Sequence, residues 1–370
     1  MNIRRLLFTE SSPNLGGQEL QSLQQMTALA RRDIDVRLAC RPGSRIRDAA
    51  RALGLDVFTV PMRMSLHPPS ILALRRLIAD WRPDAVISHS GHDADNIAVA
   101  ARLVSPRPRR IRMRTYLAGQ AKAWHGNLLS DLTLTCSAAL RAAVLANPRI
   151  NPERVRVLYP GLPLDRLAAE VRSPLPAPLD AWLDKHRGPV LLHAAMLRPE
   201  KGHALMLSAL PELLKKHPTL RYVIAGEGEL QERLAASIRV MKLGGQVCMA
   251  GLVSPLAPLY RRAELLVMPS SYEPFGISQC EALSLGLPVV ASRTGGIPET
   301  VQHQQTGLLV EPGDRLAWVA AVNWALEHRA EMSRMAEAGR LFVEKNFSIE
   351  ANVTHLLAEI TALMKAGGAR

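Results

Sequence analysis

The chain has 370 residues, of which 48% are hydrophobic and 21% are charged, a size and composition that predict an ordinary two-domain globular protein. No apolar run reaches the about 20 residues that span a bilayer, which excludes a transmembrane helix. The formal net charge is +13, and residues 1–172 contain 26 Lys+Arg and 14 Asp+Glu, whereas residues 173–370 contain 20 and 19. The excess of positive charge therefore lies almost entirely in the first half.

The first half alternates short apolar runs with helical patterns. The alternation predicts a parallel sheet with helices on both faces. We expect strands at 3–10, 35–40, 56–61, 84–90, 109–116, 132–137 and 154–161, and helices at 16–32, 68–81, 93–104 and 138–146.

Residues 173–187, "SPLPAPLDAWLDKHR", carry three prolines near their start and predict a linker. The pattern of strands and helices then restarts. Strands are expected at 189–196, 220–228, 246–253, 264–270, 288–292 and 307–312, and helices at 201–217, 229–241, 255–263, 276–286, 296–302 and beyond 315. The predicted α/β architecture is two doubly wound domains, 1–172 and 188–345, with a helical segment, 346–370, as a candidate to return to the first domain.

The four cysteines are scattered and form no CxxC pair, which argues against disulfides and against a zinc framework. The N-terminal residues read as a strand and not as a signal peptide. We therefore expect a cytoplasmic protein with no metal site.

Four glycine-bearing loops follow predicted strands: 14–19, 225–230, 273–278 and 293–299. Glycine lets a backbone approach a ligand closely, and helix N-termini favour phosphate. One such loop is as readily a simple turn, but four at strand ends favour a phosphate-bearing ligand. Arg198 and Lys201 also follow a strand and suit a diphosphate, the alternative being ordinary surface charge.

Two acids, Glu273 and Glu281, frame a Pro-Phe-Gly element in "SYEPFGISQCE". Together with "GLPVVAS", "TGGIPE", "LRPEKGH" and "GGQE", this element resembles the retaining GT-B glycosyltransferases of family 4, in order along nearly the whole chain. The resemblance implies the GT-B fold, in which two Rossmann-like domains face a central cleft. It also implies transfer of a sugar from a nucleotide-diphosphate sugar with retention of configuration, without a metal or other cofactor.

The resemblance assigns roles to particular residues. Glu281 would hold the ribose hydroxyls, which suits a carboxylate because it accepts two hydrogen bonds, and Glu273 would face the donor sugar. Lys201 and Arg198 would stabilise the diphosphate, although this chain has Ala195-Met196 where many members have Gly-Arg, so Arg198 is interpreted as the replacement. The remaining implied donor-binding residues are Gly16, Gly17, Gly226, Glu227, Val253, Phe275, Gly276, Ile277, Thr294, Gly295 and Gly296.

The acceptor side is assigned to the basic first domain. His89 matches a histidine near the reaction centre, and His92, His125 and Arg114 are acceptor candidates. The acceptor would be a glycan or a phosphorylated glycolipid such as a lipopolysaccharide core. The segments 62–77 and 106–114 place Arg beside apolar residues and predict peripheral docking on the cytoplasmic face of an anionic membrane.

Four alternatives differ in function. An inactive scaffold would keep the same fold but would not bind nucleotide. A nucleotide-sugar epimerase would share the fold but need no acceptor. A nicotinamide dehydrogenase would need G-x-G-x-x-G after the first strand, where this chain has "NLGGQE". A non-enzymatic nucleic-acid-binding protein would explain the charge, but aromatic residues are only 4% and are not interleaved with basic ones, so no nucleic acid is expected as partner.

Overall fold

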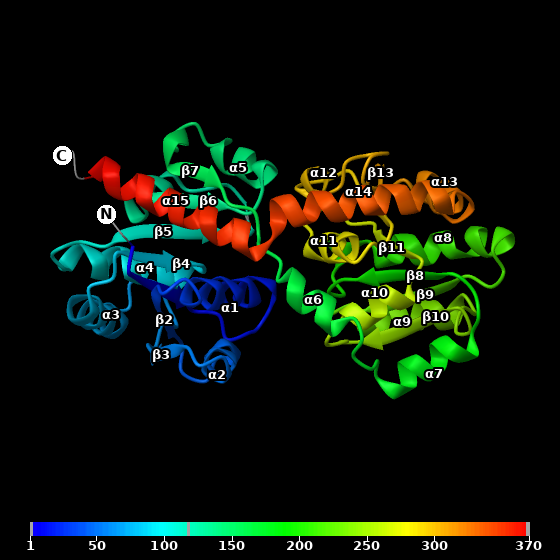
Figure 1. The fold of residues 1–370 in the computed structure, drawn as a ribbon, viewed down its shortest axis with the longest axis horizontal. Coiled ribbons are helices and arrows are strands. Elements are labelled where there is room, and N and C mark those ends of the chain that lie inside the picture. Colours follow the sequence, from blue (N-terminus) through cyan, green and yellow to red (C-terminus); the bar gives the residue numbers. More distant parts are fainter. Residues whose placement is uncertain (1–2, 117–118, 368–370) are drawn as a thin grey trace. The chain divides into compact units, whose positions relative to one another are not determined.

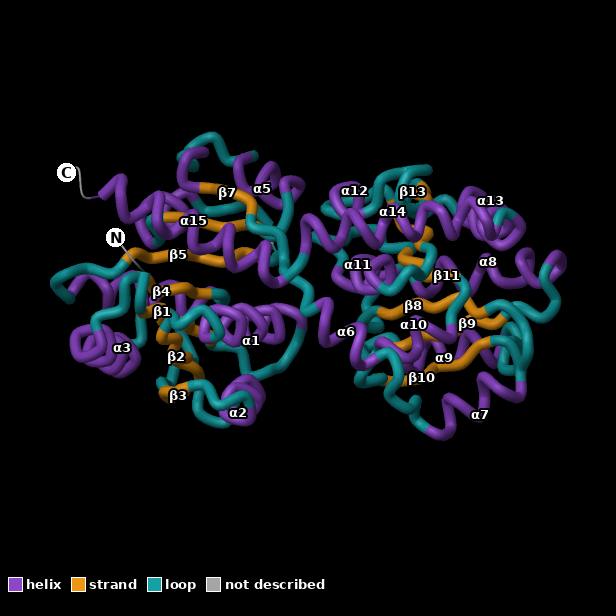
Figure 2. Tube along the Cα trace, viewed as in Figure 1, coloured by secondary structure: helices purple, strands orange, loops and turns teal. Residues whose placement is uncertain are grey.

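The computed structural model describes residues 3–116 and 119–367. It divides into two compact units, the first formed by 1–161 with 349–370 and the second by 162–348. In the described residues, the first unit holds a sheet of seven strands and the second a sheet of six, and every strand pair is parallel. Helices lie beside the strands in each unit (Figure 2). The predicted fold class, two Rossmann-like domains, is confirmed.

The first sheet has the strand order β3-β2-β1-β4-β5-β6-β7. Its strands are β1 (Arg5–Glu10), β2 (Asp35–Cys40), β3 (Asp56–Thr59), β4 (Ala85–Ser88), β5 (Arg109–Arg114), β6 (Leu132–Thr135) and β7 (Val155–Val157). The direction in which the chain adds strands reverses between β1 and β4. In open parallel sheets such a reversal opens a crevice beyond the carboxyl ends of the strands, where ligands bind.

Helices cover both faces of the first sheet because neighbouring residues of each strand point to opposite faces. Leu6 and Phe8 share a buried cluster with residues of α1 (Gly17–Ala30), α2 (Arg45–Ala52) and α15 (Ile349–Gly367), whereas Leu7 shares one with residues of α3 (Pro68–Trp81) and α4 (Gly91–Ala100). The helices of this unit are α1 (Gly17–Ala30), α2 (Arg45–Ala52), α3 (Pro68–Trp81), α4 (Gly91–Ala100), η1 (Ala101–Leu103), the π-helix η2 (His125–Leu129), α5 (Ala138–Leu145), η3 (Pro152–Arg154) and α15 (Ile349–Gly367).

The last helix, α15, returns to the first unit and completes its core (Figure 1). Its residues Ile349, Val353, Leu356 and Ile360 are buried against the strands and α1. Asn352 adds polar contacts, since its Oδ1 accepts a hydrogen bond from Gln25 (2.9 Å) and its Nδ2 donates to the Tyr159 carbonyl (2.6 Å). The predicted return of the C-terminal helix is therefore observed.

Truncation of α15 in the core should destabilise the first unit. Ile360 is fully buried, so Ile360→Ala is expected to lower the free energy of unfolding by about 2–5 kcal/mol. Leu103→Ala, at a residue that is 55% exposed in the same unit, is the control and should change it by less than about 0.5 kcal/mol. Urea unfolding followed by circular dichroism measures both, and equal midpoints would contradict the packing described for α15.

The second sheet repeats the topology of the first, with the order β10-β9-β8-β11-β12-β13 and a reversal between β8 and β11. Its strands are β8 (Val190–Ala194), β9 (Arg221–Ala225), β10 (Val247–Gly251), β11 (Leu265–Met268), β12 (Val289–Ser292) and β13 (Leu308–Val310). Its helices are α6 (Leu164–Glu170), α7 (Ala177–Lys185), η4 (Pro199–Lys201), α8 (His203–Lys216), α9 (Gln231–Val240), α10 (Ala257–Arg262), α11 (Ile277–Ser284), α12 (Ile297–Thr300), α13 (Arg315–Glu327) and α14 (Arg329–Phe347).

The unit boundaries differ from the predicted ones. The first unit ends at Gly161 and not at 172, because α6 belongs to the second unit. The predicted linker, 173–187, contains α7, whose Leu179 and Leu183 are buried. Its prolines fit this helix because Pro178 occupies its first turn, where no N–H bond is lost. At the C-terminal end the second unit extends to Ser348 rather than 345.

None of the helices in residues 3–116 and 119–367 combines the length and the apolar character needed to cross a membrane.

Candidate active site

The predicted catalytic residues follow the strands at which each sheet reverses. In the second unit, Lys201 follows β8 and Glu273 follows β11, and in the first unit His89 follows β4. Since the carboxyl ends of parallel strands share one edge, Lys201 and Glu273 come together over the second sheet. Each sheet therefore carries its chemistry-bearing side chains at its own reversal point.

Lys201 and Glu273 form an ion pair. Lys201 Nζ lies 2.6 Å from Glu273 Oε2, and the two side chains are only 16% and 12% exposed. Both charges are thus largely withdrawn from water. Burying either charge without its partner would cost free energy, so each group requires the other. The pair presents one cation and one carboxylate side by side, a combination that can bind an anionic leaving group and a sugar hydroxyl.

Glu281 lies about one turn into α11, after the Glu273 loop, and has a different partner, Tyr260. The Tyr260 hydroxyl donates to Glu281 Oε2 at 2.9 Å. Burial raises the pKa of Glu281 to about 7, while the hydrogen bond from Tyr260 opposes the shift. Neighbouring Ser278 ties α11 to β8 by donating to the Ala194 carbonyl (2.8 Å). Because Tyr260 occupies Oε2, Oε1 of Glu281 can accept a hydrogen bond from a ligand hydroxyl.

Glycines let the loops at this edge pack backbone against backbone. A Cβ on Gly226, at φ +150°, would lie 2.0 Å from the Ala195 carbonyl oxygen, and one on Gly295, at φ +52°, would lie 2.0 Å from that of Glu273. Gly296 N–H donates to the same Glu273 carbonyl (2.9 Å). The glycine loop after β12 thus fixes the backbone that carries Glu273.

Replacing Gly226 should cost stability for this reason. Gly226→Ala is expected to lower the free energy of unfolding by about 2–3 kcal/mol, because the methyl group would overlap a carbonyl and the φ angle suits only glycine. Gly244→Ala, where nothing lies within 4 Å of the added Cβ, is the matched control. Equal urea midpoints for the two variants would show that the loop can relax at no cost.

The Pro-Phe-Gly element begins α11. Gly276 precedes the helix at φ +92°, and Ile277 is its first residue. Phe275 is buried and packs edge-on against Phe347 (ring centroids 5.3 Å), so its side chain anchors the loop. Binding of the donor by the backbone amides of these three residues stays a prediction. It requires the amides to lie at the start of a helix, and they do.

The other predicted donor-binding residues are dispersed along the same edge. Arg198 and Glu227 are exposed, Val253 is buried, and Thr294 Oγ1 donates to the Ser271 carbonyl at 3.1 Å. The loops of Arg198 and Glu227 are joined, since Leu197 N–H donates to the Glu227 carbonyl (3.0 Å). Met196 is 50% exposed, so the residue that stands in place of the usual arginine contributes no charge there.

In the first unit, His89 is buried and its orientation is defined. Its Nδ1 lies 3.2 Å from the Thr9 carbonyl, which can only accept, so Nδ1 carries the proton. Burial lowers the pKa of His89, which keeps the ring neutral. Its Nε2 is buried without a hydrogen-bond partner in the described residues. A buried acceptor without a partner is costly, and a substrate hydroxyl would satisfy it.

Two carboxyl groups beside His89 were missed from the sequence. Asp93 Oδ2 accepts from Thr9 Oγ1 (2.8 Å) and from the His89 N–H (3.1 Å), and burial, with repulsion from Glu10, raises the pKa of Asp93 to about 8. Glu10 Oε2 accepts from Gln18 (2.8 Å), and its Oε1 accepts from Ser90. The only sequence signal was that Glu10 ends a buried strand.

The two glycines at the start of α1 occupy different positions, one before the helix and one within it. Gly16 precedes the helix and its N–H donates to the Glu19 carboxylate at 2.7 Å, whereas Gly17 is the first helical residue. A phosphate at Gly16 would have to displace that carboxylate. The structure therefore gives Gly16 a capping role, and its predicted contact with phosphate stays a prediction.

The acceptor candidates differ in how far their side chains are buried. His92 is exposed in the first turn of α4, with Nδ1 3.0 Å from Ser65 Oγ. Arg114 ends β5 and is half-buried, and burial together with repulsion from Arg112 lowers the pKa of its guanidinium to about 10. The side chain of His125 lies outside the described residues. Of His92 and Arg114, the two candidates whose side chains are described, Arg114 is therefore the more buried.

A pair of histidines beneath Lys201 was also missed. His193, in β8, and His203, at the start of α8, are buried and stacked with ring centroids 3.9 Å apart. His193 Nδ1 lies 2.6 Å from the Tyr222 hydroxyl. Burial lowers the pKa of His203 to about 4, and Lys201 adds to this. The neutral stack anchors the turn that carries Lys201, and sequence spacing gave no sign of it because the rings come from different elements.

Comparison with known proteins identifies the family of the chain. Residues 15–166 match the family model "Glycosyltransferase Family 4", and residues 180–342 match "Glycosyl transferases group 1". The chain is 30% identical over 301 residues to a glycogen synthase of Mycobacterium tuberculosis, a match that covers 76% of this chain and 70% of that protein.

Solved structures are similar over nearly the whole chain. A glycosyltransferase of Rickettsia africae has a TM-score of 0.85 at 19% identity and covers 99% of this chain and 100% of its own. HepE of Anabaena, solved in complex with UDP-glucose, has a TM-score of 0.80 at 19% identity and covers 97% and 99%. At these identities the likeness concerns the fold.

The twin parallel sheets give the chain the GT-B fold of these solved glycosyltransferases. The chain belongs to glycosyltransferase family 4.

Proposed function

We propose that this enzyme is a retaining glycosyltransferase whose donor, a nucleotide-diphosphate sugar, binds at the carboxyl edge of the second unit. The observation that supports it most is the Lys201–Glu273 ion pair, which is largely withdrawn from water at the sheet's reversal point. Glu281, whose Oε2 accepts a hydrogen bond from the Tyr260 hydroxyl, lies about one turn into α11. In this arrangement Glu281 holds the ribose, Glu273 meets the sugar and Lys201 stabilises the diphosphate.

The reaction would proceed by attack on the face from which the diphosphate leaves. The acceptor oxygen bonds to the anomeric carbon as the bond to the diphosphate oxygen breaks, and the acceptor proton passes to a phosphate oxygen. Lys201, with the exposed Arg198, offsets the negative charge that develops on the diphosphate. Two cations perform this neutralisation, so the proposal requires no metal and no other cofactor.

The acceptor would bind at the carboxyl edge of the first unit. His89 Nε2 is a buried acceptor there, and Arg114 is a half-buried cation that suits a phosphate or carboxylate group. An anionic glycan or phosphorylated glycolipid, such as a lipopolysaccharide core, fits this charge. A nucleotide-sugar epimerase, the alternative of the same fold, would convert the donor without any acceptor.

The first unit would reach such a glycolipid by docking on an anionic membrane from the cytoplasmic side. Met64, Leu66 and Leu72 are 52–58% exposed, and Arg75 and Arg76 on α3 are exposed as well. Apolar side chains beside cations are what an anionic bilayer surface attracts.

Vesicle sedimentation tests the docking. Arg75→Gln/Arg76→Gln is expected to weaken binding to phosphatidylglycerol vesicles roughly 30-fold, since each basic residue near the surface contributes about 1 kcal/mol. Arg233→Gln/Arg239→Gln, which removes two exposed arginines of α9, is the matched control. Equal binding of the wild-type chain to neutral and anionic vesicles would contradict the docking.

A nucleotide screen tests the donor. Thermal shift with UDP, GDP, ADP and CDP should stabilise the protein with at least one of them, and UDP comes first because HepE was solved with UDP-glucose. Activity with the corresponding sugar nucleotide should then depend on added glycan acceptor. Stabilisation by none of the four would contradict the donor proposal, and isomerised donor without acceptor would favour the epimerase.

A further inference from the structure

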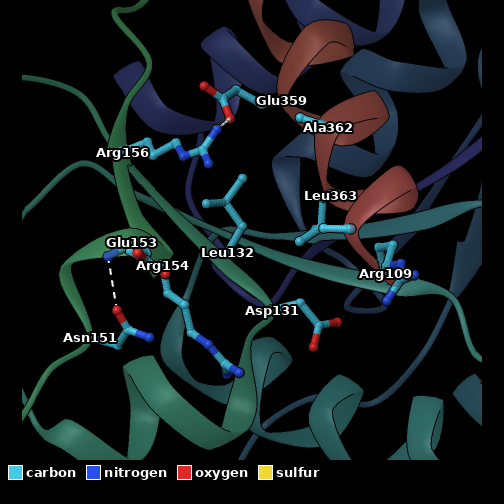
Figure 3. Close-up of a pocket in the computed structure, with 11 residues that line it drawn as sticks. Arg109, Asp131, Leu132, Asn151, Glu153, Arg154, Arg156, Glu359, Ala362 and Leu363 are labelled. Carbon is cyan, nitrogen blue, oxygen red and sulfur yellow. Dashed lines mark hydrogen bonds and ion pairs between the residues drawn. The ribbon is translucent and has the colours of Figure 1, made fainter. Parts of the chain in front are cut away.

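A cavity of about 370 Å³ opens at the edge of the first sheet opposite to the predicted acceptor site (Figure 3). Arg109 and Leu132 are the first residues of β5 and β6, Arg154 immediately precedes β7, and all three line the cavity. Glu359 and Leu363 of α15 form another wall. Because parallel strands begin at this edge and end at the other, the cavity is separate from His89 and Arg114.

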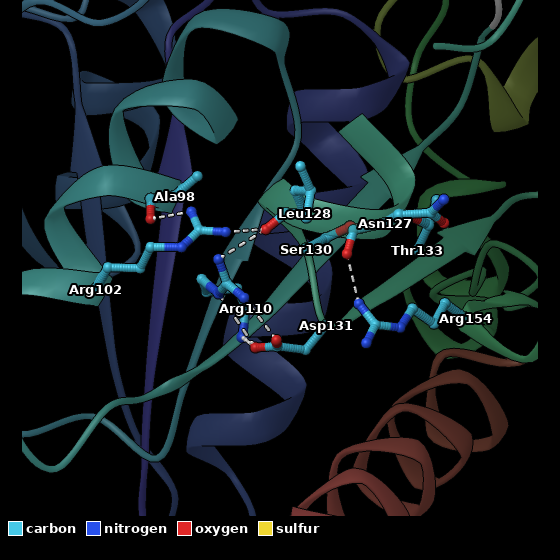
Figure 4. Close-up of polar contacts among 9 residues, drawn as sticks. All are labelled: Ala98, Arg102, Arg110, Asn127, Leu128, Ser130, Asp131, Thr133 and Arg154. Carbon is cyan, nitrogen blue, oxygen red and sulfur yellow. Dashed lines mark hydrogen bonds and ion pairs between the residues drawn. The ribbon is translucent and has the colours of Figure 1, made fainter. Parts of the chain in front are cut away.

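Most of the acids that line the cavity are already neutralised. Asp131 is held by both arms of Arg110, with Oδ1 2.6 Å from Nη2 and Oδ2 3.2 Å from Nε (Figure 4). Glu359 Oε2 accepts from Arg156 at 2.5 Å. Only Glu153, an exposed residue, adds a carboxylate that pairs with no cation within 4 Å in the described part of the chain.

Arg109 and Arg154 are the cations that remain. In residues 3–116 and 119–367 neither has a carboxylate partner, and they lie on either side of Asp131 (Figure 3). Arg154 is held in place, because its Nη1 donates to the Asn127 carbonyl at 2.6 Å (Figure 4). The π-helix that supplies this carbonyl is itself held, since Arg110 Nη1 donates to the Leu128 carbonyl at 3.1 Å. In the described part of the chain no hydrogen bond engages Arg154 Nε or Nη2, so both stay available on a pre-positioned guanidinium.

We propose that this cavity is a binding site for a small phosphorylated molecule, distinct from donor and acceptor. The phosphate would bind Arg109 and Arg154, whose planar forks match its oxygens. The remainder of the ligand would lie against Leu132, Leu363 and Ala362. The volume is within the range of small-molecule sites and exceeds what a bare phosphate fills. Pre-positioning of Arg154 reduces the entropy lost on binding.

Calorimetric titration with glucose 6-phosphate and with inorganic phosphate tests this site. The full chain carries Lys201→Met/Arg198→Gln, which removes both cations of the predicted diphosphate site, so that the result does not depend on that site or on transfer. We expect saturable binding of at least one of the two probes, and none of glucose at the same concentrations. Binding of neither phosphorylated probe would overturn the proposal.

Variants locate the binding. Arg109→Gln/Arg154→Gln should raise the Kd at least tenfold, whereas Arg149→Gln, at an exposed residue outside the lining, should leave it within twofold. Ala362→Phe fills the cavity without changing charge and should also raise the Kd tenfold, which decides the matter if the double variant does not fold. Protection from hydrogen exchange should appear at 151–156. Unchanged binding in a folded double variant or in Ala362→Phe would overturn the proposal.

Discussion

Lys201→Met is expected to lower kcat for sugar transfer by about 10²–10³, the loss typical of one preorganised group that stabilises developing negative charge. The Lys201 side chain is 16% exposed and its Nζ lies 2.6 Å from Glu273 Oε2, so little water can take the place of the ammonium group. The variant also leaves the Glu273 carboxylate without its cation, which repels an approaching diphosphate. Steady-state transfer kinetics with a saturating acceptor measure the effect.

A matched control separates this role from a general effect of charge. Lys215→Met removes a lysine whose side chain is 73% exposed and whose partner, Glu212, is also at the surface. Its kcat should equal that of the wild type within a factor of two. A Lys201→Met enzyme with kcat within threefold of the wild type would remove Lys201 from the proposed mechanism.

Glu281→Gln is expected to bind donor 10–100 times more weakly and yet to be more stable at pH 8. Burial raises the pKa of Glu281 to about 7 from 4.5, so ionisation above pH 7 costs the folded state about 3 kcal/mol. Because Glu281 is partly accessible to water, we expect Glu281→Gln to raise the free energy of unfolding at pH 8 by only about 2 kcal/mol. The loss of affinity follows from replacing a charged acceptor of two ribose hydroxyls.

The pH dependence has a definite sign. Below pH 4.5 Glu281 is protonated in both the folded and the unfolded chain, and its stabilising effect is lost as the pH rises through about 7. The stability difference between Glu281→Gln and wild type should therefore shrink to below about 1 kcal/mol at pH 5. Urea unfolding at both pH values measures it, with Glu232→Gln, at an exposed residue of α9, as control. A variant that is less stable than wild type at pH 8 would contradict the burial of this carboxylate.

Much of the fold could be predicted from the sequence where the hydrophobic period was strong. The strand expected at 35–40 is β2 (Asp35–Cys40), and the helix expected at 68–81 is α3 (Pro68–Trp81). The helix α2 (Arg45–Ala52) was missed because only Ile46 and Ala50 of its eight residues are buried. The helix α7 was missed because the prolines before and within its first turn predict a linker when read alone.

The candidate site could be predicted only where its residues follow one another in sequence. Glu273 and Glu281 share one motif, and Lys201 ends a recognisable turn. Their partners could not be found, because Tyr260 meets Glu281 and His193 meets His203 only through the order of the strands and helices. Asp93 was missed for the same reason. It lies in α4, which follows β4, and its partner Thr9 lies in β1, which is a neighbour of β4 only because the sheet reverses there.

The position of a bound nucleotide tests the central claim most directly. A crystal structure of the protein with the nucleoside diphosphate selected by the thermal screen should place the ribose hydroxyls within hydrogen-bond distance of Glu281. Its terminal phosphate should lie within reach of Lys201 Nζ. A nucleotide bound at the first sheet, or in the second unit but away from both residues, would contradict the account.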